Sequence, residues 1–370
     1  MKPFEPERLP ITSIRWEALV PAIGAANRAL AYYDGILYGV ASPEILLSPM
    51  ATQEAVLSSR IEGTRATLED VLRFEAGEAP RGESRRLDVE EILNYRKAMR
   101  LAEKALEARP FSLNLLKQLH AALLEGARGQ DKAPGSFRTT QNWIGAPGSP
   151  IEEAQFVPPP PERLAAHLDN WEKYYHLDSP DPLTHLAVLH AQFEIIHPFR
   201  DGNGRLGRMI IPLFLFERKI LSRPMFYISG YLEDHRAEYV RRLRDLGRGG
   251  HAWDNWINFF LRALAEQAQA NAAKAREIIN LYARYKERVI GLTRSRYSVP
   301  LLDRLFEQPI FRSSSLEGKP GMPTKPVIME MLGRLKKAGM LKVLDEGGGS
   351  RAQVLALAEL VNLCEGKEVI

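Results

Sequence analysis

Cysteine is almost absent from this sequence of 370 residues. The single cysteine, Cys364, has no partner for a disulfide bond within the chain. This scarcity fits a reducing compartment, so we expect a cytoplasmic protein. Lone cysteines are commonly buried and inert, and no histidine stands near Cys364 in the sequence to activate its thiol. The sequence therefore does not favour a cysteine nucleophile.

Long apolar runs and a large charge excess are also missing. The longest apolar stretch, Met209 to Phe216, is far shorter than the roughly 20 residues that a membrane span needs. The chain begins MKPFEPERLP, which is charged and proline-rich and therefore unlike an export signal. With 50 basic and 46 acidic side chains, the net charge of +4 is too slight to indicate a polyanionic partner. We expect a globular protein of about two or three domains with no membrane contact.

Helical periodicity dominates the chain. Asp181 before Pro182, and Ser112, are typical of residues that begin a helix. Apolar residues recur at three- and four-residue spacing in the ranges 16–40, 50–61, 68–75, 87–109, 113–125, 162–177, 182–196, 205–220, 233–246 and 253–290. The pattern predicts a nearly all-α fold.

One segment, from Gly135 to Pro161, interrupts this pattern. Two short β-prone runs, 137–144 and 155–157, flank a turn region rich in glycine and proline. They are typical of a β-hairpin. A long surface loop explains these residues equally well.

The last part of the chain, 298–370, has a different order of elements. The sequence predicts helices at 301–307 and 325–338, then strands at 341–344 and 353–357 around a run of three glycines. This order resembles a winged helix, a fold that often binds DNA. The region holds ten Lys and Arg against nine Asp and Glu, so it lacks the strong basic field of a DNA-binding domain. A protein-docking or dimer-forming module is at least as well supported.

The chemistry concentrates in the run HPFRDGNGRLGR, from His197 to Arg208. Two glycines flank Asn203 in a loop that opens directly into a helix. Unpaired backbone amides and the helix dipole favour an anion there, and a phosphate chain is the best match. Arg205 and Arg208, three residues apart, lie on one face of the first turns, and guanidinium groups suit phosphate oxygens.

Two further side chains complete a phosphoryl-transfer site. Asp201 lies beside the anion cradle, where Mg²⁺ needs one or two carboxylates together with phosphate oxygens. His197 ends the preceding helix, and a neutral imidazole there can accept a proton from a hydroxyl group. Alone, each of these residues is weak evidence, because helix-end histidines and first-turn arginines usually have structural or solvated roles. Together they predict phosphoryl transfer.

The same run also satisfies G-x-G-x-x-G from Gly202 to Gly207, the pattern of dinucleotide-binding folds. That fold requires a β-strand before the motif. The preceding residues, 182–196, are predicted to be helical, so we reject this interpretation.

The run from His197 to Arg208 resembles the signature of the Fic family at every fixed position, and the resemblance extends roughly from Met50 to Leu261. It implies a helical core with a β-hairpin flap over the active site. It also implies transfer of AMP from ATP to Ser, Thr or Tyr hydroxyls of a target protein. His197 would be the general base and Asp201 the Mg²⁺ ligand. The residues expected to bind the nucleotide are Gly202, Asn203, Gly204, Arg205, Leu206, Gly207, Arg208 and Tyr239.

Some details of the resemblance bear on specificity. Gly204 fits AMP transfer, because the Doc branch, which phosphorylates its targets, has lysine there. Ile144, Gly145 and Val157 resemble the flap residues that align the target polypeptide by edge pairing. Tyr239 resembles a position that packs against the nucleoside, although many relatives have a second tyrosine where this chain has Val240.

A built-in inhibitor is also implied. Ser58, Glu62 and Gly63 resemble the inhibitory helix motif of the family, whose glutamate pairs with the second motif arginine, here Arg208. A carboxylate at that arginine competes with the γ-phosphate of ATP and repels it. From these residues alone, Glu62 is an ordinary surface glutamate at a helix end.

We therefore expect an N-terminal helical region with the inhibitory helix (1–85), a Fic catalytic core (86–290) and a winged-helix-like domain (298–370). The expected partners are ATP, Mg²⁺ and a target protein, with self-modification and a homodimer as further expectations. The alternative is a DNA-binding transcriptional regulator whose Fic core senses nucleotide.

Overall fold

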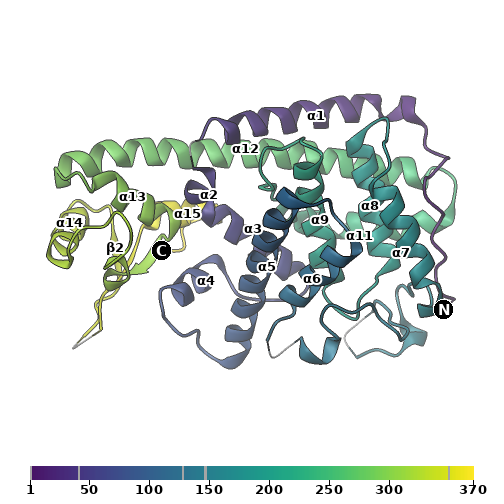
Figure 1. Cartoon of the computed structure of the whole chain (residues 1–370), viewed down its shortest axis with the longest axis horizontal. Helices are drawn as coiled ribbons and strands as arrows, with labels where there is room; N and C mark the ends of the chain where they lie inside the picture. The colour runs from purple at the N-terminus through teal and green to yellow at the C-terminus, as the bar shows by residue number, and fades with distance from the viewer. Residues whose placement is uncertain (1, 41, 127–128, 146–147, 349–350) are drawn as a thin grey trace. The chain divides into compact units, whose positions relative to one another are not determined.

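The computed structural model describes residues 2–40, 42–126, 129–145, 148–348 and 351–370. Most of them are helical, which confirms the predicted fold class (Figure 1). The α-helices are α1 (Trp16–Tyr38), α2 (Pro43–Leu46), α3 (Ser48–Ile61), α4 (Leu68–Glu75), α5 (Glu83–Ala108), α6 (Leu113–Leu123), α7 (Pro161–Tyr175), α8 (Pro182–Ile196), α9 (Asn203–Glu217), α10 (Ser229–Asp234), α11 (Arg236–Asp245), α12 (Ala252–Thr293), α13 (Ser298–Glu307), α14 (Lys325–Lys337) and α15 (Ala358–Glu365). Short 3₁₀ turns are η1 (Gln130–Lys132), η2 (Ile151–Glu153), η3 (Leu246–Arg248) and η4 (Ser313–Leu316), and the strands are β1 (Ile310–Arg312), β2 (Lys342–Asp345) and β3 (Val354–Ala356).

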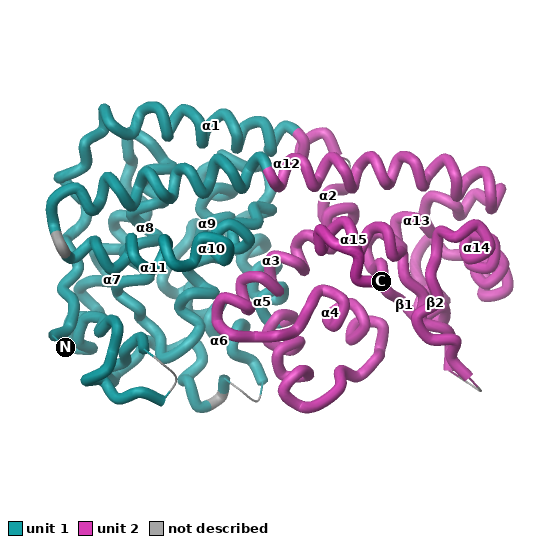
Figure 2. Tube along the Cα trace, turned by 180° about the vertical axis from the view of Figure 1, so that it is seen from behind, with its two compact units in different colours: residues 1–35, 94–269 teal, residues 36–93, 270–370 magenta. Residues whose placement is uncertain are grey.

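The chain forms two compact units (Figure 2). Unit 1 consists of residues 1–35 and 94–269, and unit 2 of residues 36–93 and 270–370. Helices α1, α5 and α12 each contain a point where the chain passes from one unit to the other. These units differ from the regions 1–85, 86–290 and 298–370 expected from the sequence, and those functional boundaries stay a prediction.

Unit 1 is built around α8. All residues of α8 except Pro182 and Glu194 are buried, because its sequence is apolar on every side and α7 and α9 pack against it. The side chain of Asp181 accepts the Thr184 amide at 2.7 Å and begins the helix, as the sequence indicates. The indole N–H of Trp171 donates to the Leu189 carbonyl at 2.9 Å. These contacts fix the helix that ends at the motif.

Unit 2 joins two segments that lie far apart in the sequence. Helix α4 contacts β1, while α15 contacts α3 and α4. The sheet is antiparallel in the order β1-β3-β2, with Leu355 opposite Phe311 on one side and Val343 on the other. The two predicted strands are present, and β1 is an additional strand whose three residues are too few to show a periodicity. The winged-helix interpretation stays a prediction.

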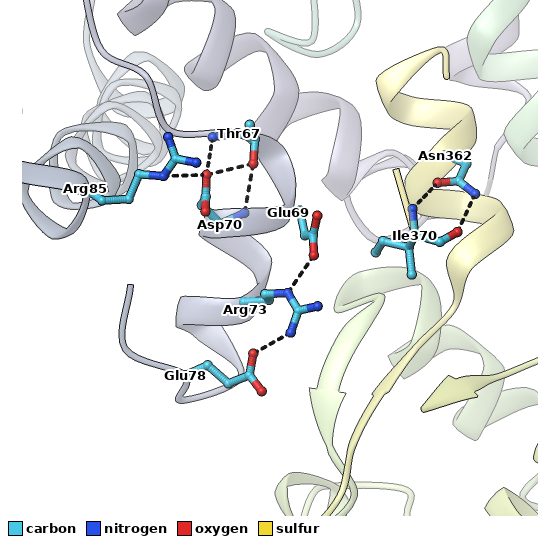
Figure 3. A network of polar contacts seen from close by, with 8 residues as sticks. All are labelled: Thr67, Glu69, Asp70, Arg73, Glu78, Arg85, Asn362 and Ile370. Atoms are coloured by element: carbon cyan, nitrogen blue, oxygen red, sulfur yellow. Dashed lines mark hydrogen bonds and ion pairs between the residues drawn. The ribbon is translucent and has the colours of Figure 1, made fainter. Parts of the chain in front are cut away.

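Polar contacts hold α4 in unit 2 (Figure 3). Thr67 and Asp70 form a reciprocal capping box at its first turn, and Arg85 reaches Asp70 at 3.2 Å. At the other end, Arg73 lies 2.7 Å from Glu78. Because these ion pairs are partly exposed, each contributes at most about 1 kcal/mol. Arg312 of β1 donates to the Ala76 and Gly77 carbonyls just after α4, which ties the helix to the sheet.

One predicted helix is wrong in its extent. The range expected as 233–246 is two helices, α10 and α11, that meet at His235. The His235 ring stacks on Tyr231 with centroids 4.0 Å apart, and its Nδ1 lies 3.0 Å from the Tyr231 carbonyl oxygen. Such a side chain-to-backbone contact competes with helix continuation and leaves no trace in apolar periodicity. No helix in the described ranges is both long and apolar enough to span a bilayer.

Two buried histidines of α8 predict how stability depends on pH. Burial lowers the pKa of His185 to about 4 and that of His190 to about 3. Each neutral ring donates one N–H to a carbonyl, His185 to Tyr174 and His190 to Gly207. An unfolded histidine, with an ordinary pKa near 6.5, binds a proton more readily than either buried ring. Their stabilising effect is therefore complete above about pH 6.5 and is lost as pH falls through about 4 for His185 and about 3 for His190.

We expect His190→Gln to flatten the fall in unfolding free energy between about pH 6.5 and pH 4.5 by about 1.4 kcal/mol per pH unit. Urea titrations across this range measure the slope. The exposed His176→Gln is the matched control and should keep the parent slope. Equal slopes in both variants would contradict a neutral buried His190.

Candidate functional site

The motif forms the turn between α8 and α9, both in unit 1. His197 follows α8 with φ 47° and ψ 61°, a left-handed conformation that is rare outside glycine. Gly202 precedes α9 and is also left-handed, with φ 75°. The chain thus reverses between two left-handed residues, one at each end of the short turn between the helices. Nδ1 of His197 lies 3.3 Å from the Glu194 carbonyl oxygen.

Asn203 closes this turn. Its side-chain oxygen accepts the Phe199 amide at 2.9 Å, and its side-chain nitrogen donates to the Phe199 carbonyl at 2.9 Å. Asn203 is 2% exposed and Phe199 fully buried, so these bonds are shielded from water. The structure therefore gives the Asn203 side chain a loop-closing role. An added contact with phosphate stays a prediction.

The two motif arginines are buried, in contrast to the solvated position usual for first-turn arginines. Arg205 is 3% and Arg208 2% exposed. The guanidinium of Arg205 lies 3.5 Å from a carboxylate oxygen of Asp201. Buried guanidinium groups attract anions strongly because little water screens them. Both therefore suit the charged end of a nucleotide.

Asp201 presents the carboxylate best suited to a metal ion. Its side chain is 47% exposed, and one oxygen accepts the Gly202 amide at 2.5 Å. The other oxygen has no hydrogen bond or ion pair with any described residue. Among the described residues, no three histidine, cysteine or carboxylate side chains gather as a metal site. An ion at Asp201 would therefore take its remaining ligands from phosphate and water, which fits Mg²⁺.

Leu206 and Gly207 have packing roles. Leu206 is fully buried, so only its backbone can face a ligand. A Cβ atom at position 207 would lie 2.1 Å from a carboxylate oxygen of Glu194, so a larger residue there would displace the Glu194 side chain where α9 approaches α8. These two motif positions therefore serve packing, unlike the motif positions that have charged side chains.

Tyr239 lies in a buried aromatic cluster. Its side chain is 7% exposed, and its hydroxyl lies 2.9 Å from Nε2 of His190. Since the other ring nitrogen of His190 donates to the Gly207 carbonyl, this hydroxyl donates to Nε2. The Tyr239 ring centroid is 5.8 Å from that of Trp256. Tyr239 therefore connects α11 to α9 through His190. Contact between Tyr239 and a nucleoside stays a prediction.

His120 supports the turn and was missed by sequence reasoning. Its Nδ1 accepts the Gly135 amide at 2.8 Å, so Nε2 carries the proton and donates to the Asp201 carbonyl at 3.1 Å. Its ring stacks on Phe199 with centroids 3.8 Å apart. Burial lowers the pKa of His120 to about 4, which keeps the ring neutral. In the sequence it is one polar residue on an apolar helix face, with no local signal of its contacts.

The flap is less regular than the predicted hairpin. Ile144 and Phe156 form a single antiparallel bridge, with the Ile144 amide donating at 2.8 Å, and η2 lies between them. Two of the preceding residues bond to the motif turn, while the Gln141 side chain donates across the flap to the Pro158 carbonyl at 3.0 Å. The Asn142 side chain donates to the Phe199 carbonyl at 2.9 Å, and the Arg138 amide donates to the Pro198 carbonyl at 2.9 Å.

The three flap residues expected to align a target differ in exposure. Ile144 is 39% exposed, and it is followed by Gly145, where an added Cβ atom would lie 2.8 Å from the Ser149 hydroxyl. Val157 is 1% exposed, and its carbonyl accepts the Phe4 amide at 2.8 Å. The tip residues 146–147 lie outside the described residues. Ile144 and Gly145 are therefore the accessible part of the expected pattern.

Ser58 and Glu62 belong to unit 2. Ser58 is fully buried in α3, and Glu62 is an exposed residue just after that helix. Gly63, with φ 106°, ends the turn as the sequence indicates, its amide donating to the Arg60 carbonyl at 2.9 Å. Pairing of Glu62 with Arg208 stays a prediction.

Comparison with known proteins identifies relatives of the region that contains the motif. Residues 20–104 match the model of the Fic/DOC family N-terminal region, and residues 110–215 match that of the Fic/DOC family. A probable protein adenylyltransferase of Aquifex aeolicus is 32% identical over 99 residues, which are 26% of this chain and 28% of that protein. Protein adenylyltransferase fic-1 of Caenorhabditis elegans is 26% identical over 187 residues, 49% of this chain and 32% of that protein.

Solved structures show the same fold. A Fic family protein from Desulfovibrio desulfuricans superposes with a TM-score of 0.59 at 19% identity, covering 95% of this chain and 98% of its own. A Fic domain containing signaling protein from Bacteroides thetaiotaomicron has a TM-score of 0.54 at 18% identity, covering 68% and 97%. The chain spans about a third or less of the two curated relatives described above. The family models together account for just over half of the residues, and the chain belongs to the Fic family.

Proposed function

We propose that this protein transfers AMP from ATP to a hydroxyl side chain of a target protein. The observation that carries the proposal is the motif turn, where the His197 imidazole, the Asp201 carboxylate and two buried arginines are attached to one closed loop. The names of the curated relatives support the same activity. The acceptor is a Ser, Thr or Tyr of another protein or of the chain itself.

The reaction follows from the chemistry of these groups. The His197 imidazole takes the proton of the target hydroxyl, and the hydroxyl oxygen attacks the α-phosphorus of ATP. A new bond joins this oxygen to the α-phosphorus, the bond to the bridging oxygen breaks, and pyrophosphate leaves. The backbone amides at the start of α9 stabilise charge on the α-phosphate, while Arg205 and Arg208 hold the outer phosphates. Asp201 would hold Mg²⁺, which neutralises phosphate charge when bound.

We also propose that Glu62 restrains this activity, as the family resemblance implies. The carboxylate competes with the γ-phosphate for Arg208, so ATP is excluded or is held in an unproductive position. The buried position of Arg208 supports the proposal, because a buried guanidinium favours an anionic partner when no nucleotide is bound.

The C-terminal region does not favour nucleic acid as the main partner. Three of the four basic side chains of α14 bond within unit 2: Lys325 to Glu317, Arg334 to Glu330 and Lys336 to Gln353. Side chains engaged in this way are less available to phosphates. We therefore put forward no DNA-binding function.

His197→Ala is expected to lower AMP transfer by about 10²–10⁴-fold, because it removes the general base and leaves the phosphate-binding groups in place. Transfer of label from ATP carrying ³²P at the α-phosphate to protein measures the rate. His176→Ala is the matched control, since His176 also follows the end of a helix, α7. A variant at position 197 that labels protein at the parent rate would rule out this mechanism.

Glu62→Gly is expected to raise labelling. A charge-assisted contact contributes about 1.5–3 kcal/mol, so freeing Arg208 should raise the rate by roughly 10- to 100-fold. Glu125→Gly is the matched control, because Glu125 likewise stands just after a helix and before a glycine. If both variants label protein like the parent, Glu62 is no inhibitor. If the folded Glu62→Gly protein transfers no AMP to any protein, the proposed activity is wrong.

A further inference from the structure

Arg138 stands in the segment that leads to the flap, and its guanidinium is buried, with 3% of the residue exposed. Its partners among the described residues are all backbone carbonyls. Nε bonds to the His197 carbonyl at 2.9 Å, and Nη2 reaches the Ile196 carbonyl at 3.3 Å and the Pro159 carbonyl at 2.5 Å. Nη1 lies 3.4 Å from the Thr140 carbonyl. The Arg138 side chain therefore bonds to the end of α8 and to both ends of the flap.

The charge of Arg138 matches the end of α8. No carboxylate bonds to its guanidinium within the described residues. Burial lowers the pKa of Arg138 to about 10, which still leaves it charged at neutral pH. The final carbonyls of a helix carry partial negative charge and lack partners within the helix. Arg138 supplies both the missing donors and the compensating charge.

These bonds act on the backbone conformation of His197. The Ile196 carbonyl belongs to the peptide plane before the His197 Cα, and the His197 carbonyl belongs to the plane after it. Holding both planes fixes φ and ψ of His197, and these angles set the direction in which its side chain leaves the backbone. The left-handed conformation of His197 is disfavoured in a residue with a Cβ atom. Such a conformation persists only where surrounding contacts impose it.

We propose that Arg138 is a positioning residue that holds the His197 imidazole in its catalytic orientation and couples this orientation to the flap. This inference rests on the proposed function, since it takes His197 as the base. The coupling is direct, because the Pro159 carbonyl, at the far end of the flap, shares Nη2 with the Ile196 carbonyl. Arg138 does not touch the reacting atoms.

The test uses Arg138→Lys and Arg138→Gln in the full chain carrying Glu62→Gly. An ammonium group lacks the planar fork of guanidinium, so the lysine variant cannot hold both peptide planes at once. A misplacement of about 1 Å costs on the order of 100-fold in rate. We expect kcat for AMP transfer to fall by about 10- to 100-fold in both variants, while the Kd for Mg-ATP changes less than about threefold.

The chain offers a matched control at Arg218. This arginine also donates to carbonyls at a helix end, those of Tyr175, the last residue of α7, at 2.6 Å and of Leu177 at 3.4 Å. Arg218→Lys and Arg218→Gln make the same chemical change away from the motif turn, and they should leave kcat within about threefold of the parent.

A second readout is independent of activity. Hydrogen exchange by mass spectrometry should show faster exchange, by at least about tenfold, in peptides covering residues 197–203 and 138–144 of the Arg138 variants. In the Arg138 variants, peptides from α7 should exchange as in the parent. In the Arg218 variants, exchange in residues 197–203 and 138–144 should not change. If Arg138→Gln does not fold, the lysine variant, which keeps the charge, decides the question.

The outcomes separate this inference from the proposed function. Unchanged exchange in the motif turn, an unchanged kcat, or equal loss of kcat and ATP affinity would each overturn the positioning role. If the parent transfers no AMP while exchange in the turn still rises, Arg138 shapes the loop and the assigned activity is wrong. Faster exchange in the motif turn, together with a lower kcat and an unchanged Kd for Mg-ATP, would support both the positioning role and the proposed function.

Discussion

The site depends on the reciprocal hydrogen bonds between the Asn203 side chain and the Phe199 backbone. A turn between two helices leaves the carbonyls of the first and the amides of the second without partners. Asn203 closes the turn from within, and the Asp201 carboxylate accepts the Gly202 amide just before α9. On the other side, His120 holds the Asp201 carbonyl. The turn is thus held by Asn203 from within the motif and by His120 from outside it.

Much of the helical framework could be predicted from the sequence. Helices α4 and α8 begin and end where periodicity and capping residues indicate, because those signals act over three or four residues. The motif could also be recognised from the sequence, since its residues are contiguous. Long-range contacts could not be recognised in this way. His120 and Arg138 act on residues 81 and 59 positions away in the chain, and no local pattern announces such a contact.

The flap illustrates the same limit. Its two β-prone runs were recognised, yet only Ile144 and Phe156 pair among the described flap residues. Of the expected strand residues before Ile144, Arg138 and Asn142 donate to the motif turn, and Gln141 donates to the Pro158 carbonyl. On the other side, prolines at 158–160 have no amide to donate. Strand propensity predicted that these residues are extended. Which residues they pair with depends on the tertiary fold.

The segment near Phe4 has a practical consequence. Its amide is bonded to Val157, its ring lies 5.4 Å from that of Phe156, and Glu5 forms an ion pair with Arg163 at 2.7 Å. Any affinity tag or fusion partner joined ahead of Lys2 would therefore emerge beside the Ile144–Phe156 bridge. Recombinant protein is better tagged elsewhere, so that foreign residues do not disturb the contacts that Phe4 and Glu5 make with this segment.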